Sequence, residues 1–83
     1  MIKGVYTILD EKAQNIGPLF ICENDQVAER IVRSSYTDRN SIPCRYPSDF
    51  SLLCLGDIET VNGCITARAV PTLVSKLDSL LEV

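Results

Sequence analysis

The chain has no histidine, no CxxC pair and no long uninterrupted apolar run. Without histidine it lacks the usual general base and the usual partner of a nucleophilic cysteine or serine, so we expect a protein that is not an enzyme. Its four cysteines are Cys22, Cys44, Cys54 and Cys64. Because no histidine can complete a mixed zinc site, we expect reduced, mostly buried thiols and neither a metal site nor a cofactor.

Further classes of protein lack support in the sequence. No apolar run approaches the roughly 18 to 20 residues that cross a bilayer, and the first apolar stretch meets acid at Asp10, too soon for a signal peptide. Glycine-rich phosphate loops and calcium loops are also missing. We therefore expect a cytoplasmic protein without membrane contact or a nucleotide site.

The composition is that of an ordinary globular domain, with 46% hydrophobic and 23% charged residues. We expect residues 1–83 to form a single domain. Because a chain this short buries only ~60% of its surface on folding, we also expect a homodimer or a higher homo-oligomer. The net charge of −3 gives no general attraction to phosphates, so any contact with nucleic acid has to be a local patch.

The first half of the chain predicts two strands and a helix. Residues 2–9 are rich in β-branched and aromatic side chains, which favours a strand, and residues 19–22 form a short apolar second strand. Residues 24–36 change to helical spacing, with Asn24 as the N-cap and Glu29 turned to water. The apolar stripe of this helix consists of Val27, Ala28, Ile31 and Val32.

The second half predicts a hairpin and a second helix. A strand over residues 51–58 leads to Asn62-Gly63, the dipeptide that best tolerates a type I′ turn, and a return strand follows. This turn would pair Ile58 with Ala67 and Asp57 with Arg68. Alternation would place one set of side chains on the core face: Leu52, Cys54, Gly56, Ile58, Ile65, Ala67 and Ala69.

The last segment, residues 71–82, has helical spacing of its leucines, namely Leu73, Leu77 and Leu80 or Leu81. Together the elements predict an α+β domain. We expect a small four-stranded antiparallel sheet with two helices, in the order β-β-α-β-β-α.

Arginines gather in the middle of the chain. Between residues 30 and 46 they outnumber the one acid, Asp38, and two tyrosines lie among them. Guanidinium groups bind phosphates and tyrosine rings stack on bases, which is the combination that single-stranded nucleic acid requires. The candidate DNA-binding residues are Arg30, Arg33, Arg39, Arg45, Tyr36 and Tyr46. The alternative is a solvated helix face with a basic loop, in which both tyrosines serve the core.

The stretch from Tyr46 to Phe50, "YPSDF", also has two interpretations. It could be a recognition loop that presents Asp49 between two aromatic rings. More often such a segment is a turn in which Pro47 sets the backbone and the rings anchor it to the core.

Two long stretches carry a resemblance to a known family. "VYTILDEKAQNIGPLFICENDQVAERIV" and "YPSDFSLLCLGDIE" resemble the small non-structural protein of gokushovirus-type microviruses, which are single-stranded DNA bacteriophages. The match runs from about Val5 to Ile65. The residues that fit the family pattern are Asp10, Lys12, Ala13, Pro18, Leu19, Phe20, Ala28, Arg30, Ile31, Tyr46, Pro47, Asp49, Phe50, Leu52, Cys54, Gly56 and Asp57.

The resemblance implies a DNA-binding protein that acts in viral single-stranded DNA synthesis or packaging, in the cytoplasm of a bacterial host. It supplies no site that transfers residue by residue. A symmetric dimer would place two copies of the arginine-rich segment side by side, which would double the local positive charge while the acidic surface faces elsewhere. The alternative is a protein-interaction module that binds a phage replication or capsid protein without DNA contact, through the leucine stripe of residues 71–82.

Overall fold

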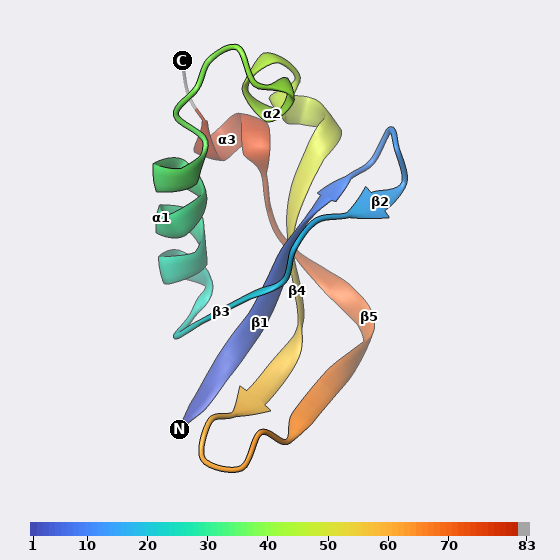
Figure 1. The fold of residues 1–83 in the computed structure, drawn as a ribbon. Coiled ribbons are helices and arrows are strands. Elements are labelled where there is room, and N and C mark those ends of the chain that lie inside the picture. The colour runs from blue at the N-terminus through green and yellow to red at the C-terminus, as the bar shows by residue number, and fades with distance from the viewer. Residues whose placement is uncertain (82–83) are drawn as a thin grey trace.

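The molecule is built on an antiparallel sheet, and helices cover one face of that sheet (Figure 1). The computed structural model describes residues 1–81. Its strands are β1 (Ile2–Asp10), β2 (Asn15–Ile16), β3 (Phe20–Cys22), β4 (Phe50–Glu59) and β5 (Ile65–Lys76). Its helices are α1 (Asp25–Ser35), α2 (Ile42–Arg45) and α3 (Leu77–Leu80), with a 3-10 turn, η1, at Pro47–Asp49. The predicted α+β class is confirmed, with one strand and one short helix more than expected.

Strand β1 is the centre of the sheet. It pairs with β4 along its whole length, and its other edge pairs with β3 at Gly4–Tyr6 and with β2 at Leu9 and Asp10. Within residues 1–81, strand β5 pairs with β4 alone and therefore forms the outer edge of the sheet. The strands predicted from residues 2–9 and 19–22 are confirmed as β1 and β3.

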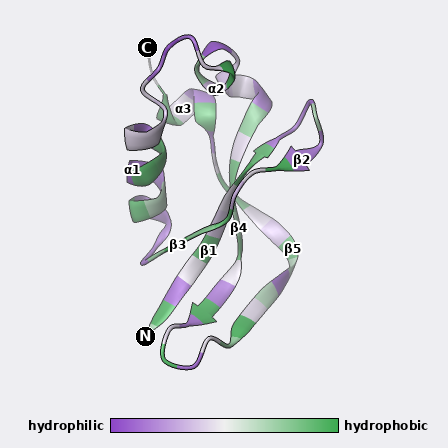
Figure 2. Ribbon diagram, viewed as in Figure 1, coloured by the Kyte–Doolittle hydropathy of each residue, from purple (hydrophilic) through white to green (hydrophobic). Residues whose placement is uncertain are grey.

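Helix α1 matches its prediction closely. The side-chain oxygen of Asn24 accepts a hydrogen bond from the Val27 backbone N–H at 2.9 Å, as an N-cap does. Ala28 and Val32 are buried in the core, and Figure 2 shows the alternation of hydrophobic and hydrophilic residues along the helix. The prediction is wrong for Glu29, which is half-buried and accepts a hydrogen bond from the Ser75 hydroxyl of β5.

The position of the Tyr6 ring explains why β1 contains a glycine, Gly4. A Cβ atom at Gly4 would lie 2.5 Å from the Tyr6 ring, so glycine leaves the space in which that ring lies. The ring reaches α1, where the Tyr6 hydroxyl donates a 2.7 Å hydrogen bond to the Asp25 carboxylate. Burial and the neighbouring Asp25 raise the pKa of this phenol well above its usual range. Tyr6 thus joins the sheet to the first turn of α1.

A β-bulge in β4 makes the predicted core face wrong for the second half of this strand. Leu55 has no partner in β1. Because of this extra residue, the side chains after Leu55 lie on the opposite face from the one that regular alternation would give them. Cys54 lies on the face that α1 covers and is buried, as predicted. Gly56 and Ile58 lie on the opposite face, contrary to the prediction, because the extra residue reverses the alternation. Asp57 is on the α1 face in their place.

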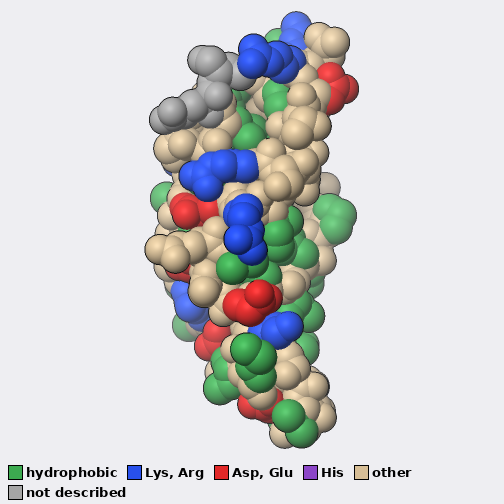
Figure 3. All heavy atoms as spheres, turned by 90° about the vertical axis from the view of Figure 1, so that its left-hand side faces the viewer, with side chains coloured by type: hydrophobic (Ala, Val, Ile, Leu, Met, Phe, Trp, Pro, Cys, Tyr) green, Lys and Arg blue, Asp and Glu red, His purple; other side chains and the backbone are tan. Residues whose placement is uncertain are grey.

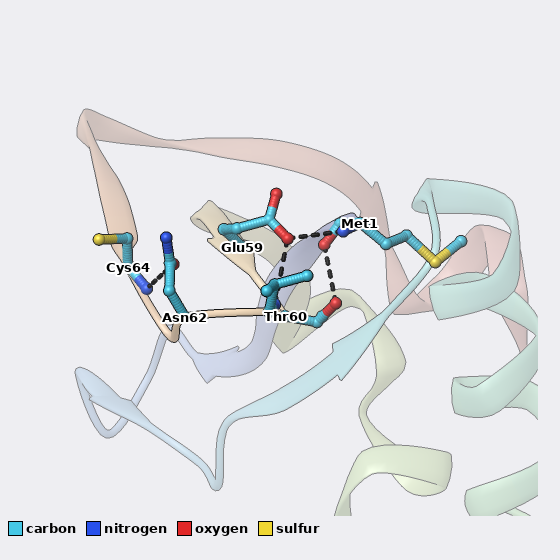
Figure 4. Close-up of polar contacts among 6 residues, drawn as sticks. Met1, Glu59, Thr60, Asn62 and Cys64 are labelled. Atoms are coloured by element: carbon cyan, nitrogen blue, oxygen red, sulfur yellow. Dashed lines mark hydrogen bonds and ion pairs between the residues drawn. The ribbon is translucent and has the colours of Figure 1, made fainter.

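The β4–β5 hairpin has a longer turn than predicted. Ile58 pairs with Ile65 and Asp57 with Thr66, so the predicted register is displaced by two residues and the Asp57–Arg68 pair does not form. Gly63 has a positive φ of 77°, as expected, but Asn62 does not. Instead the Asn62 side chain accepts a hydrogen bond from the Cys64 N–H at 2.9 Å, which favours a wider loop than a type I′ turn (Figure 4).

The same loop holds the start of β1. The Met1 amine donates to the Glu59 carboxylate at 2.6 Å, and the Thr60 hydroxyl donates to the Met1 carbonyl at 2.9 Å (Figure 4). These contacts extend the β1–β4 ladder to the tip of the hairpin.

The predicted helix over residues 71–82 is wrong for most of its length. Residues up to Lys76 belong to β5, and only Leu77–Leu80 are helical; residue 82 lies outside the described residues. Leu77 and Leu80 are buried in the core, whereas Leu73 is 55% exposed on β5. Pairing with β4 overrides the helical spacing of the leucines here.

Candidate nucleic-acid interface

The six residues predicted to bind DNA come from α1, from α2 and from the loop that joins them. Arg30 and Arg33 are on α1, Tyr36 is its C-cap, Arg39 is in the loop that follows, and Arg45 and Tyr46 end α2. All four arginines are exposed. Helix α1 ends and α2 begins at the upper end of the molecule in Figure 1, so chain continuity keeps these side chains in one region.

The arginines in this region have no acidic partner among residues 1–81. The ion pairs of the described chain join the Met1 amine to Glu59, Lys3 to Glu23 and Lys76 to Glu11. Figure 3, which looks onto α1, shows Lys and Arg side chains spaced along the upper half of this face. Guanidinium groups without carboxylate partners are available to bind an external anion.

A hollow of about 340 Å³ brings three of the predicted residues together: Arg33, Tyr36 and Arg39. We call it the basic hollow. The other lining residues, which were not predicted, are Thr37, Cys44, Leu80 and Leu81. The two leucines could not be predicted because they come from the far end of the chain. The hollow combines two cationic groups, one aromatic ring and apolar side chains.

Tyr36 and Tyr46 differ in their surroundings. Tyr36 is half-buried, and burial raises the pKa of its phenol, so the ring is uncharged near neutral pH. Tyr46 is 50% exposed, and the Arg45 guanidinium lies over its ring at 5.6 Å from the centroid. The anchor interpretation of "YPSDF" is right for Phe50, which is buried, and wrong for Tyr46.

Two of the predicted arginines lie outside the basic hollow. The Arg45 guanidinium lies over the Tyr46 ring, and Arg30 lies one turn before Arg33 on α1. The structure therefore separates a central set, Arg33, Tyr36 and Arg39, from two flanking arginines.

Arg68, the remaining arginine, belongs to a different site. It lines a hollow of about 510 Å³ at the start of α1, together with Glu23, Asp25 and Asp57. The three carboxylates outnumber the two cationic groups of this hollow, Arg68 and Lys3, so its surface is a poorer candidate for phosphate contact than the basic hollow. Its acidic character makes Arg68 a useful control for the basic hollow.

Two further features of the described residues concern metal ions and membranes. Within residues 1–81, no three His, Cys, Asp or Glu side chains are grouped as a metal ion would require. No helix in this part of the chain has the length and apolar character needed to cross a membrane.

Comparison with known proteins gives one result. Residues 3–80 match the family model described as phage ORF5 protein. No curated protein and no solved structure matches the chain. Since the family model covers nearly the whole sequence, the chain belongs to the phage ORF5 protein family.

Proposed function

We propose that this phage protein binds single-stranded DNA without strong sequence preference and acts in viral DNA synthesis or packaging, in the cytoplasm of the infected cell. The observation that carries the proposal is the basic hollow, where Arg33 and Arg39 have no acidic partner among residues 1–81 and flank Tyr36. The role is binding, without catalysis or a cofactor.

The chemistry of the hollow suits a single strand. Two guanidinium groups can each donate hydrogen bonds to a pair of phosphate oxygens, and the Tyr36 ring offers a surface to any base. Phosphate contacts fix position but do not distinguish sequences, which explains a lack of sequence preference. Arg30 on α1, and Arg45 with Tyr46 at the end of α2, would add contacts with the DNA on either side of the basic hollow.

The family model shows a phage protein, and the resemblance to microvirus non-structural proteins supports a role with phage DNA. Because the protein is acidic overall, we propose that it works as a homodimer, which would place two basic hollows on one strand. Light scattering of the DNA-free protein at micromolar concentration tests this, and a mass of one chain would contradict it.

The alternative, a module that binds a phage replication or capsid protein, loses one of its supports. Leu77 and Leu80, two leucines of the stripe that would have met the partner, are buried in the protein's own core. The alternative would be favoured only if the binding experiment with oligothymidine, described below, detected no binding.

Binding to a labelled oligothymidine should weaken steeply as salt rises, with a log-log slope of about −0.7 for each phosphate neutralised. The double variant Arg33→Gln, Arg39→Gln removes two cationic groups from the basic hollow. We expect its slope to become shallower by about 1.4, since two phosphate contacts are lost. Fluorescence anisotropy over a salt series measures both slopes.

The matched control is Arg68→Gln, which removes an exposed arginine from the acidic hollow and should leave the slope unchanged. A loss in Arg68→Gln about half as large as in the double variant, in proportion to the one charge removed, would show that only total charge matters. No binding by the unmodified protein at low salt would refute the proposed function.

A further inference from the structure

A second hollow shares one lining residue, Tyr36, with the basic hollow. Its volume is about 230 Å³, several times the ~30 Å³ that one water molecule occupies in the liquid. We call it the apolar hollow. The sheet side is lined by Ile8, Pro18 and Phe20, and the helix side by Ile31, Ser35 and Tyr36.

We propose that the apolar hollow receives one base of a bound single strand, while the adjoining phosphate lies on Arg33 and Arg39. The inference rests on the proposed function and adds a base site to it. It assigns the two hollows to the two chemically different parts of a nucleotide.

The arrangement of the two hollows carries the proposal. The sugar of a nucleotide holds a flat ring with apolar faces at a short, fixed distance from a charged phosphate. The end of α1 offers the matching pair of surfaces: Arg33 and Tyr36 line the basic hollow, while Ser35 and Tyr36 line the apolar hollow. A purely apolar ligand would leave the arginines unused, and an inorganic anion would leave the apolar hollow empty.

Aromatic side chains stand on both sides of the apolar hollow. Phe20 comes from β3, and its ring is stacked on Tyr6 with centroids 5.8 Å apart and planes inclined by 26°. Tyr36 comes from the end of α1 and stays neutral near physiological pH. Stacking on such rings tolerates every base, in agreement with binding that has no strong sequence preference.

The test compares an oligothymidine with an abasic oligonucleotide of the same length at one low salt concentration. Since stacking of a base is worth a factor of about ten, the unmodified protein should bind the oligothymidine about tenfold more tightly. Ser35→Phe fills the apolar hollow and should abolish this preference while the salt slope remains. Ser34→Phe is the matched control: it is the adjacent, exposed residue of α1, lines neither hollow, and should keep the preference.

Each result decides between the claims. Equal, salt-dependent affinity of the unmodified protein for both oligonucleotides overturns the base site and leaves the proposed function standing. Binding of neither oligonucleotide overturns the proposed function and the base site together. A preference that survives in folded Ser35→Phe places the base elsewhere and also overturns the inference. If circular dichroism shows that Ser35→Phe does not fold, Ser35→Leu fills the hollow with a smaller side chain under the same criteria.

Discussion

Replacing Gly56 by alanine should reduce the free energy of unfolding by about 3 kcal/mol, because the new methyl group has no space. A Cβ atom at this position would lie 2.3 Å from the Thr66 carbonyl oxygen and 2.9 Å from the Ala67 Cα atom. Both atoms belong to the backbone of the neighbouring strand β5, so a change of rotamer cannot relieve the contact. Urea unfolding followed by circular dichroism measures the loss.

Gly17→Ala is the control for this substitution. Its Cβ atom would meet only the Ile8 carbonyl oxygen at 3.5 Å, an ordinary contact, and we expect a change below about 0.5 kcal/mol. If Gly56→Ala were as stable as Gly17→Ala, the close approach of β4 and β5 next to the bulge would be wrong.

The second large effect is expected in the centre of the core. Leu52 lies on β4, is fully buried and belongs to the cluster that also contains Ala28 and Val32 of α1. Leu52→Ala should cost about 3 kcal/mol, because it removes apolar contacts and leaves a cavity between sheet and helix. Thermal unfolding should show a correspondingly lower midpoint.

Leu73→Ala makes the same chemical change on the neighbouring strand β5. Because Leu73 is 55% exposed, we expect a loss below about 1 kcal/mol. The comparison also tests the assignment of residues 71–76 to a strand. In the helix first predicted there, Leu73 would share a stripe with Leu77, and its truncation would cost nearly as much as that of Leu52.

The parts of the fold that were predicted correctly are those that depend on nearby residues. Helix α1 follows from the spacing of Val27 to Val32 and from the Asn24 cap, all within one short segment. The errors concern pairing between distant segments. The bulge at Leu55 and the extension of β5 to Lys76 come from the fit of β4 against its two neighbours, which no local pattern records.

The same distinction applies to the candidate site. Arg33, Tyr36 and Arg39 could be grouped from the sequence because they are six residues apart at most. The apolar hollow could not be predicted, since Phe20 and Ile8 reach it only when β3 and β1 pack against α1. Leu80 reaches the basic hollow only because α3 packs on the core at the same end.

The pairing of β1 with β4 has a consequence for how the chain acquires its structure. Ile2 lies opposite Glu59, so the central pair of the sheet joins segments separated by most of the sequence. Closing so long a loop costs entropy before any contact repays it, and proteins dominated by such distant pairings fold slowly for their size. During synthesis on the ribosome, the first strand would wait without its main partner until residues 50–59 have emerged. Helix α1 can form earlier, but its apolar stripe would stay exposed to water and to other nascent chains during that interval.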